Sequence, residues 1–466
     1  MTLAKRLLII GGGIAGLSAA WRIQQLGWDY TLLESQARLG GMVLTDCIEG
    51  CLAEAGPESF ITRKPQLWQL AHELGLQAEI LPVASEARGT AILHQGQIVP
   101  VPLGPAQLLG TPLLSWSGKL RLLAEPFVAA KTDGQDESLA AFATRRLGRE
   151  ASQYLVEPIL AGIYSSDPHT QSVLTTASIL PELEQQGSLL RGMLAQGRVR
   201  SRARKSGAVL PPRSFTFKRG AYTLVQALQS KLTGDVRTQT AVRMLEQIGT
   251  QWCAQLATGE TIKADAVLIA TQANVAAKLL NDCAPAAAAL LRTIRHDGIG
   301  SLSLAYRQPD VPMRVTGLMI PRREGRRIDA ITVRGAPRAK AGHVLVRVFF
   351  GGAAPDMLAL DDPGLQTAVR NELGELLGIT AEPLAASVRR WCDCFPKPMV
   401  GHPKLIAQIE AHLPLGLALA GNSYHGIGVP DVVHSAERAI AKLISYACYH
   451  EGHEEHEKAE KPSRSS

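Results

Sequence analysis

The chain has 466 residues, of which 46% are hydrophobic and 20% are charged, and its formal net charge is +7. This length is too great for one ordinary core and predicts two or three domains, while the composition excludes a fibrous or disordered protein. The positive charge suits an anionic ligand or an acidic membrane surface, but we find no zinc-finger spacing, basic zipper or basic aromatic stripe and expect no nucleic-acid partner.

The first predicted elements form a βαβ unit. A strand over residues 6–10 is followed by a glycine turn over 11–16, a helix that ends at residue 26 and a second strand over 30–34. Such a unit opens a doubly wound parallel sheet. A helical pattern then runs over residues 57–76.

A change of domain is predicted between residues 99 and 112, where prolines and glycines crowd together. A mostly helical region follows over residues 113–191. Its end carries a basic run without an apolar period, which we interpret as an exposed basic loop over residues 191–215. The cations of this run are Arg198, Arg200, Arg202, Arg204 and Lys205.

The second half of the chain is predicted to return to a buried sheet after passing through an antiparallel region. Continuous apolar residues predict buried strands over 264–271 and 417–420. Alternation over 300–350 favours antiparallel strands of a substrate domain. Helices are predicted over 223–232 and 432–446.

Gly11, Gly13 and Gly16 form a dinucleotide-binding motif between the first strand and the first helix. The first glycine permits the tight turn, the second lets a pyrophosphate approach the backbone, and the third lets helix and strand pack closely. The helix N-terminus, at Ile14 and Ala15, then offers free N–H groups and a partial positive charge to the diphosphate.

Two further elements point to FAD. Glu34, followed by Ser35, ends the second strand, where an acid can accept hydrogen bonds from both ribose hydroxyls of an adenosine. Arg38, Gly40 and Gly41 form an R-x-G-G element, in which the glycines let the chain turn beside the diphosphate and the arginine offsets its charge. This element distinguishes an FAD site from a nicotinamide site.

With these motifs the chain resembles the flavin amine oxidase and protoporphyrinogen oxidase superfamily. A second FAD contact of that superfamily is matched by residues 419–422 and 426–431, ahead of the closing helix. The segments that are similar to the porphyrinogen oxidase branch are 54–60, 157–168, 187–192 and Trp391 with 395–396 and 401–402. The chain departs from the usual pattern at Gln272, Lys397 and Ala436, where proline, glutamine and glycine are common.

The resemblance implies an FAD-dependent enzyme of haem biosynthesis that oxidises protoporphyrinogen IX or coproporphyrinogen III to the porphyrin. It also implies three successive two-electron steps, with molecular oxygen as acceptor and peroxide as by-product. The cofactor carries this chemistry. No Ser-His-Asp set or carboxylate pair emerges from the sequence, so we name no catalytic residue. Coproporphyrinogen carries four carboxylates and protoporphyrinogen two, and the sequence does not decide between them.

The motifs and the resemblance together predict a set of ligand contacts. The predicted cofactor-binding residues are Gly11, Gly13, Ile14, Ala15, Gly16, Glu34, Ser35, Arg38, Gly40, Gly41, Gly56, Pro57, Glu58, Gly421, Asn422, Gly428 and Val429. Arg88 is a candidate partner for a substrate carboxylate, with a surface arginine as an equal alternative. Leu113, Leu114 and Trp116 are candidates for peripheral membrane contact, with a core helix as the stronger alternative.

Two other functions stay open. An amine or polyene oxidase of the same superfamily would keep FAD, and Tyr424 would then be one wall of an aromatic cage, although no cysteine for flavin linkage lies between Asn422 and Cys448. A binding protein without redox activity would have damaged R-x-G-G or C-terminal FAD motifs, and both are intact.

The expected fold class is α/β, with an FAD-binding Rossmann-like doubly wound domain, an α+β substrate domain and a helical insertion. The FAD-binding domain is expected to be discontinuous, because its motifs lie at both ends of the chain. The predicted boundaries are 1–80, 216–298 and 410–447 for FAD binding, 81–102 and 299–409 for the substrate domain, 103–190 for the helical domain, 191–215 for the basic loop and 448–466 for a disordered tail.

Seven cysteines, an odd number thinly spread over the chain, do not form a disulfide framework. We therefore expect a reducing, cytoplasmic location. The pairs Cys47 with Cys51 and Cys392 with Cys394 have no second pair at metal-ligand spacing, so we predict no bound metal. No signal peptide and no stretch of membrane-spanning length is recognised, so membrane contact would be peripheral.

Overall fold

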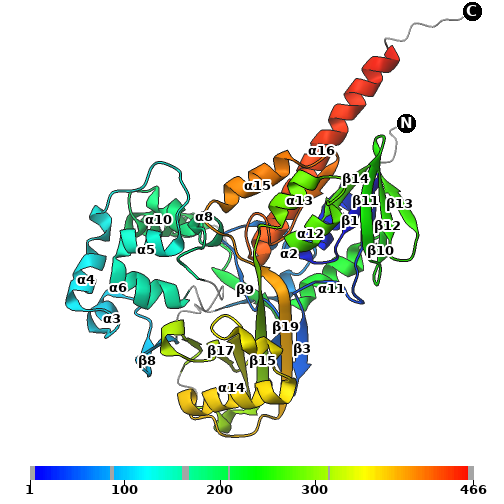
Figure 1. The fold of residues 1–466 in the computed structure, drawn as a ribbon. Coiled ribbons are helices and arrows are strands. Elements are labelled where there is room, and N and C mark those ends of the chain that lie inside the picture. Colours follow the sequence, from blue (N-terminus) through cyan, green and yellow to red (C-terminus); the bar gives the residue numbers. More distant parts are fainter. Residues whose placement is uncertain (1–5, 84–88, 160–166, 208–209, 313–314, 460–466) are drawn as a thin grey trace, which may run out of the picture.

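A five-stranded parallel sheet lies at one end of the molecule (Figure 1), in a computed structural model that describes residues 6–83, 89–159, 167–207, 210–312 and 315–459. Its order is β10 (Asp235–Arg237), β2 (Asp29–Leu33), β1 (Arg6–Ile10), β14 (Ala266–Ile269) and β20 (Leu417–Leu419), with every pairing parallel. The predicted buried strands are confirmed. The mixed α/β class is confirmed as well.

Alternate residues of the central strand face two different layers. Leu7 and Ile9 pack against helices α1, α2, α11 and α16, whereas Leu8 and Ile10 pack toward a small antiparallel sheet and helices α12, α13 and α15. The first set spans Ile14–Gln25, Gln66–Glu73, Tyr222–Lys231 and Val429–Ala459. The second layer comprises β11 (Val242–Ile248), β12 (Gln251–Leu256), β13 (Thr261–Ala264), α12 (Ala273–Leu279), α13 (Pro285–Leu291) and α15 (His402–Ala411). The parallel sheet is therefore covered on both faces.

A seven-stranded sheet stands beside this unit, with helix α14 (Asp362–Leu377) packed on one of its faces (Figure 1). Its order is β19 (Ala385–Pro396), β15 (His296–Arg307), β18 (His343–Phe350), β17 (Ile328–Arg334), β16 (Gly317–Met319), β7 (Thr90–His94) and β8 (Gln97–Pro100). The predicted antiparallel strands are confirmed, and the single exception is the parallel pairing of β16 with β7.

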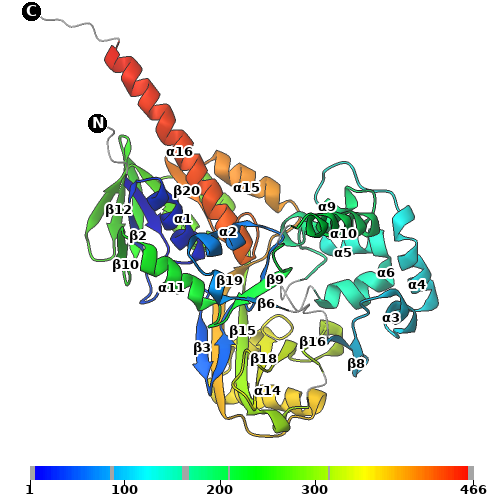
Figure 2. The same cartoon turned by 180° about the vertical axis from the view of Figure 1, so that it is seen from behind.

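Helices dominate residues 105–205, which lie to one side of the two larger sheets (Figure 2). They are α3 (Pro105–Gly110), α4 (Trp116–Leu123), α5 (Leu139–Leu147), α6 (Arg149–Ala151), α8 (Val173–Thr176), α9 (Ile179–Glu184) and α10 (Leu189–Lys205). The shorter turns of helix in the chain are η1 (Gln77–Glu79), η2 (Glu125–Phe127), η3 (Ser152–Val156), η4 (Gln308–Asp310), η5 (Arg322–Glu324) and η6 (Pro355–Ala359).

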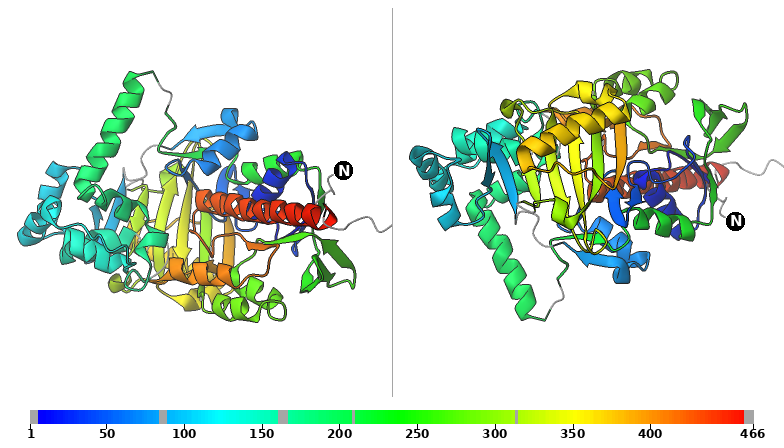
Figure 3. Two further views of the ribbon diagram at one scale, coloured as in Figure 1. Left: turned by 90° about the horizontal axis from the view of Figure 1, so that it is seen from above. Right: turned by 90° about the horizontal axis from the view of Figure 1, so that it is seen from below.

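The prediction of a loop at the basic run is wrong, because α10 continues through it to Lys205. Figure 3 shows this helix projecting from the helical region. The Ser188 side chain caps its first turn by accepting a hydrogen bond from the N–H of Arg191 at 3.0 Å. In the sequence the arginines alternate with small or apolar residues, so apolar residues do not recur at the spacing of a helix.

Two other expected boundaries are also wrong. The helix predicted over 57–76 is replaced by a short strand β5 (Phe60–Ile61) and then α2, which starts only at Gln66. The tail predicted to be disordered from residue 448 continues the closing helix α16 to Ala459. The remaining strands are β3 (Thr45–Ile48), β4 (Cys51–Glu54), β6 (Ile80–Pro82) and β9 (Ser214–Phe217).

Candidate FAD and substrate site

The glycines of the turn over residues 11–16 differ in the space around them. An added Cβ at Gly16 would lie 1.9 Å from the carbonyl oxygen of Gly11, whereas one at Gly13 would meet nothing within 4 Å. Gly11 also has a φ of 110°, which L side chains rarely adopt. Gly11 and Gly16 are therefore required by the turn itself, and Gly13 leaves space beside it.

Helix α1 begins at Ile14 with Gly13 as its N-cap, and no side chain caps this end. Gly13, Ile14 and Ala15 all line a cavity of about 840 Å³. A helix end with free N–H groups and a partial positive charge favours an anion. The space beside Gly13 and the uncapped helix together fit the diphosphate of a dinucleotide.

The R-x-G-G element lies across the same helix end. Its Gly40 N–H donates to the carbonyl oxygen of Gly12 at 2.8 Å. Arg38 donates through Nη2 to the carbonyl oxygen of Gly41 at 2.7 Å, and its guanidinium lies 6.0 Å from the ring centroid of Trp391. Arg38 therefore holds the loop in shape.

Glu34 braces the turn through its carboxylate. The N–H of Gly12 donates to Oε2 at 2.8 Å, and the N–H of Gln36 donates to Oε1 at 2.7 Å. The Ser35 hydroxyl lies 3.3 Å from Oε1. Because a carboxylate has about four acceptor positions, Glu34 retains capacity for ribose hydroxyls.

The cavity brings together eleven of the predicted cofactor residues. They are Gly13, Ile14, Ala15, Gly40, Gly41, Gly56, Pro57, Gly421, Asn422, Gly428 and Val429. The six that do not line it are Gly11, Gly16, Glu34, Ser35, Arg38 and Glu58. Arg88 lies outside the described residues. Chain segments from both ends of the sequence thus meet at one site.

Glu58 faces arginines. Its Oε1 accepts a hydrogen bond from Nε of Arg334 at 2.7 Å. Burial alone would raise the pKa of Glu58, but the positive charges of Arg334, Arg338 and Arg347 outweigh burial and hold its pKa below the usual value. This carboxylate is therefore ionised and committed to a charge cluster.

The start of α16 forms another wall of the cavity. Asp431 accepts a hydrogen bond from the N–H of Gly428 at 3.2 Å, and it also forms an ion pair with Lys64. Such an acid in the first helical turn reaches back to the N-cap N–H and stabilises the helix end. Burial, then the nearby charge of Arg63, lowers the pKa of Lys64, while Glu182 opposes the shift. Asp431 therefore caps the helix while lining the cavity.

Sequence reasoning missed the walls that the helical region and the seven-stranded sheet contribute. From the helical region, the apolar lining residues are Phe142, Ala143, Leu147, Leu155, Val156, Ile159, Ala177, Ile179, Leu180 and Leu189. From the sheet, Ser301, Arg347 and Phe349 face the same space. Arg347 had a visible signal, because it interrupts an apolar strand where a charge is costly to bury.

Tyr424, proposed as a wall of an aromatic cage, does not line the cavity. Its side chain is buried, and its hydroxyl donates to the carbonyl oxygen of Thr271 at 3.2 Å. Trp391 does line the cavity, with its indole N–H bonded to the carbonyl oxygen of Ala55 at 2.8 Å. Among the described residues, no group of three His, Cys, Asp or Glu side chains is arranged to hold a metal ion.

A parallel sheet covered on both faces, a glycine turn at an uncapped helix end and a cavity continuing toward a second sheet define a dinucleotide-dependent enzyme. Residues 14–444 match the family model described as flavin containing amine oxidoreductase. The chain belongs to this flavin containing amine oxidoreductase family. It is accordingly an FAD-dependent oxidoreductase.

Relatives match over nearly the whole length. The chain is 30% identical to the coproporphyrinogen III oxidase of Bacillus subtilis (strain 168), over 95% of this chain and 98% of that protein. It is 26% identical to protoporphyrinogen oxidase 2, chloroplastic/mitochondrial, of Arabidopsis thaliana, over 95% and 94%. A crystal structure from Exiguobacterium sp. 255-15 superposes with a TM-score of 0.82 at 27% identity, covering 95% of this chain and 99% of that one.

Proposed function

We propose that this chain oxidises a porphyrinogen, either coproporphyrinogen III or protoporphyrinogen IX, to the porphyrin in haem biosynthesis. The observation that carries the proposal is the continuity of one cavity from the α1 N-terminus to apolar walls in the helical region. Such a space accepts a flat apolar ligand beside a dinucleotide. The names of the full-length relatives support the same substrate class.

The proposed roles of the lining residues follow from their chemistry. The N–H groups at Gly13, Ile14 and Ala15 would bind the diphosphate, and Glu34 would accept the ribose hydroxyls. Gly428 and Val429 would place the positive end of α16 against the flavin ring. When bound, FAD would accept hydride equivalents from the substrate and pass the electrons to molecular oxygen. The apolar walls would exclude water and orient the macrocycle.

The remaining predicted contacts are proposed for the same cofactor. Gly11 and Gly16 would shape its turn, Arg38 with Gly40 and Gly41 would hold the loop over it, and Ser35 would brace Glu34. The other proposed contacts are Gly56, Pro57, Glu58, Gly421 and Asn422. For Glu58 the contact would be indirect, through the arginines that surround it.

The domain boundaries are proposed as the sequence predicts them, except at the basic segment. Segments 1–80, 216–298 and 410–447 would form a Rossmann-like FAD-binding domain, since all five parallel strands fall within them. Segments 81–102 and 299–409 would form the substrate domain, which contains six strands of the larger sheet and all of β15 beyond residue 298. Residues 103–190 would form a helical domain, which α10 extends to Lys205.

A cytoplasmic location with peripheral membrane contact is part of the proposal. No described helix has the length and apolar character needed to cross a bilayer. Leu113 and Leu114 are buried and support the core alternative, whereas Trp116 is 69% exposed and Phe127 is 87% exposed. Exposed Phe127 lies in η2, which packs against the basic α10, and an exposed apolar residue beside a basic helix fits an anionic lipid surface.

A substrate panel under oxygen tests the function. Purified protein reconstituted with FAD should convert coproporphyrinogen III or protoporphyrinogen IX into fluorescent porphyrin, with peroxide formed in step. Absence of porphyrin and peroxide from both would overturn the proposal. Turnover of an amine instead, with flavin that stays on the acid-precipitated protein, would indicate the amine oxidase alternative.

A further inference from the structure

Arg347 is a buried cation in the wall of the cavity. It lies in β18 and is only 5% exposed, and it lines the cavity beside Ser301 and Phe349. Its Nη2 donates to the carbonyl oxygen of Gly56 at 3.0 Å and reaches the Ser301 hydroxyl at 3.4 Å. Its Nε is buried without a hydrogen-bond partner. Its polar contacts are therefore incomplete.

The acids near Arg347 are already paired with other arginines. Glu54 accepts a hydrogen bond from Nη1 of Arg338 at 2.7 Å, and Glu58 is paired with Arg334 at 2.7 Å. Among the described residues, Arg347 has no carboxylate within ion-pair distance. Three arginines thus face two glutamates, which leaves one positive charge uncompensated beside the cavity.

The other cations of the cavity wall differ in this respect. Arg63 pairs with Glu182 at 2.5 Å, and Lys64 pairs with Asp431. Arg347 instead has only neutral oxygens and the face of Phe349, whose ring centroid lies 4.5 Å from the guanidinium carbon. A cation with no acid partner is the natural position for the charge of a ligand.

Burial makes this charge unfavourable without a partner. Desolvation lowers the pKa of Arg347 to about 10, although Glu58 and Glu54 partly oppose the shift. The guanidinium is still protonated at neutral pH. An anion entering the cavity would therefore relieve a cost that the free protein carries.

We propose that Arg347 forms an anion subsite of the cavity, occupied either by a carboxylate of the substrate or by the negative charge of the reduced flavin. Both sources present a delocalised anion that a fixed, desolvated positive charge stabilises. If the anion is a substrate carboxylate, the subsite rests on the proposed function. If the anion is the reduced flavin, the subsite rests only on the chain's membership of the flavoprotein family.

The test compares Arg347→Met and Arg347→Lys with a matched control, Arg390→Met. Arg390 belongs to the same sheet and also has a buried Nε without a partner, but it pairs with Asp362 at 2.6 Å and does not line the cavity. Two quantities are measured on each FAD-loaded protein. One is the midpoint potential without substrate, and the other is the affinity for coproporphyrin and for its uncharged tetramethyl ester.

If a carboxylate occupies the subsite, Arg347→Met should lose at least about tenfold in affinity for coproporphyrin but not for the ester, the scale of a lost charge-assisted contact. If the reduced flavin occupies it, the equilibrium for reduction should fall about tenfold, which lowers the midpoint potential by about 30 mV. Arg347→Lys keeps the charge and should retain most of either property.

The subsite is overturned if Arg347→Met alters neither quantity, or if Arg390→Met alters the same quantity equally. A wild-type protein that binds neither the porphyrin nor its ester would contradict the proposed function, and the midpoint potential alone would then decide the subsite. If Arg347→Met does not fold, Arg347→Gln, which stays polar but loses the charge, replaces it with the same expected losses, and a folded Arg347→Gln that alters neither quantity overturns the subsite.

Discussion

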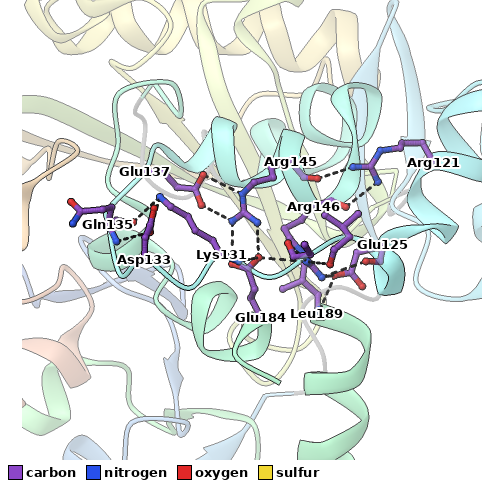
Figure 4. A network of polar contacts seen from close by, with 12 residues as sticks. Arg121, Glu125, Lys131, Asp133, Gln135, Glu137, Arg145, Arg146, Glu184 and Leu189 are labelled. Atoms are coloured by element: carbon purple, nitrogen blue, oxygen red, sulfur yellow. Dashed lines mark hydrogen bonds and ion pairs between the residues drawn. The ribbon is translucent and has the colours of Figure 1, made fainter. Parts of the chain in front are cut away.

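The cavity wall at the glycine turn and the wall in the helical region are stabilised by different interactions. At the glycine end, backbone groups form the site and an apolar parallel sheet supports it. In the helical region, half-buried and buried ion pairs connect helices and loops (Figure 4). Arg145 pairs with Glu137 at 2.6 Å and with Glu184 at 2.5 Å, and fully buried Arg146 pairs with Glu125.

The buried charges also position a wall of the cavity. Glu125 accepts hydrogen bonds from the N–H groups of Leu189 at 2.8 Å and Leu190 at 3.3 Å, and so it holds the start of α10. Leu189 itself lines the cavity. The comparison teaches that a side chain added at Gly13 should displace the ligand and leave the fold intact, whereas removing one partner of a buried ion pair should destabilise the fold itself.

The largest effect is expected at Gly13. Gly13→Val should be isolated largely without flavin, because the branched side chain would occupy the space left for the diphosphate. The fold should survive, since an added Cβ meets nothing within 4 Å. Flavin absorbance and circular dichroism check both statements. Gly104→Val, also at an open helix N-cap, is the control and should keep its flavin. Full flavin in Gly13→Val would show that the turn is only structural.

The helical region should respond to the loss of one charge. Glu125→Gln removes the nearer counter-charge of fully buried Arg146 and leaves only Glu184, whose Oε1 lies 3.5 Å from Nη1, so the free energy of unfolding should fall by up to about 3–5 kcal/mol. The double variant Glu125→Gln with Arg146→Met removes both charges, while Gln keeps an acceptor for the N–H groups of Leu189 and Leu190, and it should be less destabilised than Glu125→Gln alone. Urea denaturation measures the difference. Equal losses in the two proteins would argue against a buried ion pair.

Glu34 tests whether a side chain contributes to FAD binding beside the backbone groups of the glycine turn. Glu34→Gln keeps the shape but removes the charge, so FAD binding should weaken by about 1–3 kcal/mol. Calorimetric titration of the apoprotein gives the affinity. Glu246→Gln is the matched control, because Glu246 lies in β11, outside the glycine turn and the cavity lining. Unchanged affinity in Glu34→Gln would remove this carboxylate from the site.

Lys397, which directly follows β19, tests the effect of a buried charge next to the seven-stranded sheet. Burial lowers its pKa to about 8, while Asp297 opposes and Arg322 reinforces the shift. Between about pH 8 and the unfolded value of 10.5 the unfolded chain binds more protons, so stability should rise with pH in that window. Relative to Lys397→Gln, wild type should gain about 1–3 kcal/mol there. If the free energy of unfolding changed with pH in the same way in both proteins, the lowered pKa of Lys397 would be contradicted.

Local sequence patterns predicted the glycine turn and the R-x-G-G element, because the residues of each are close together in the chain and each glycine stands where a side chain would block the turn or the ligand. They failed for α10, whose N-terminus is held by Glu125 from another segment and whose arginines mask its period. They also failed for Arg347, whose contacts come from segments distant in the sequence, Gly56 after β4 and Ser301 in β15. Long-range charge pairing leaves no periodic trace in the chain.

The parallel sheet has a consequence for how the cofactor is acquired during protein synthesis. β1 pairs with β14, and β14 pairs in turn with β20, so the edge of the sheet is missing until residues 417–419 have left the ribosome. At typical translation rates the glycine turn waits roughly 20–80 s for that strand. FAD therefore meets a polypeptide that has been synthesised at least as far as β20, and nascent chains that stall before β20 should emerge colourless.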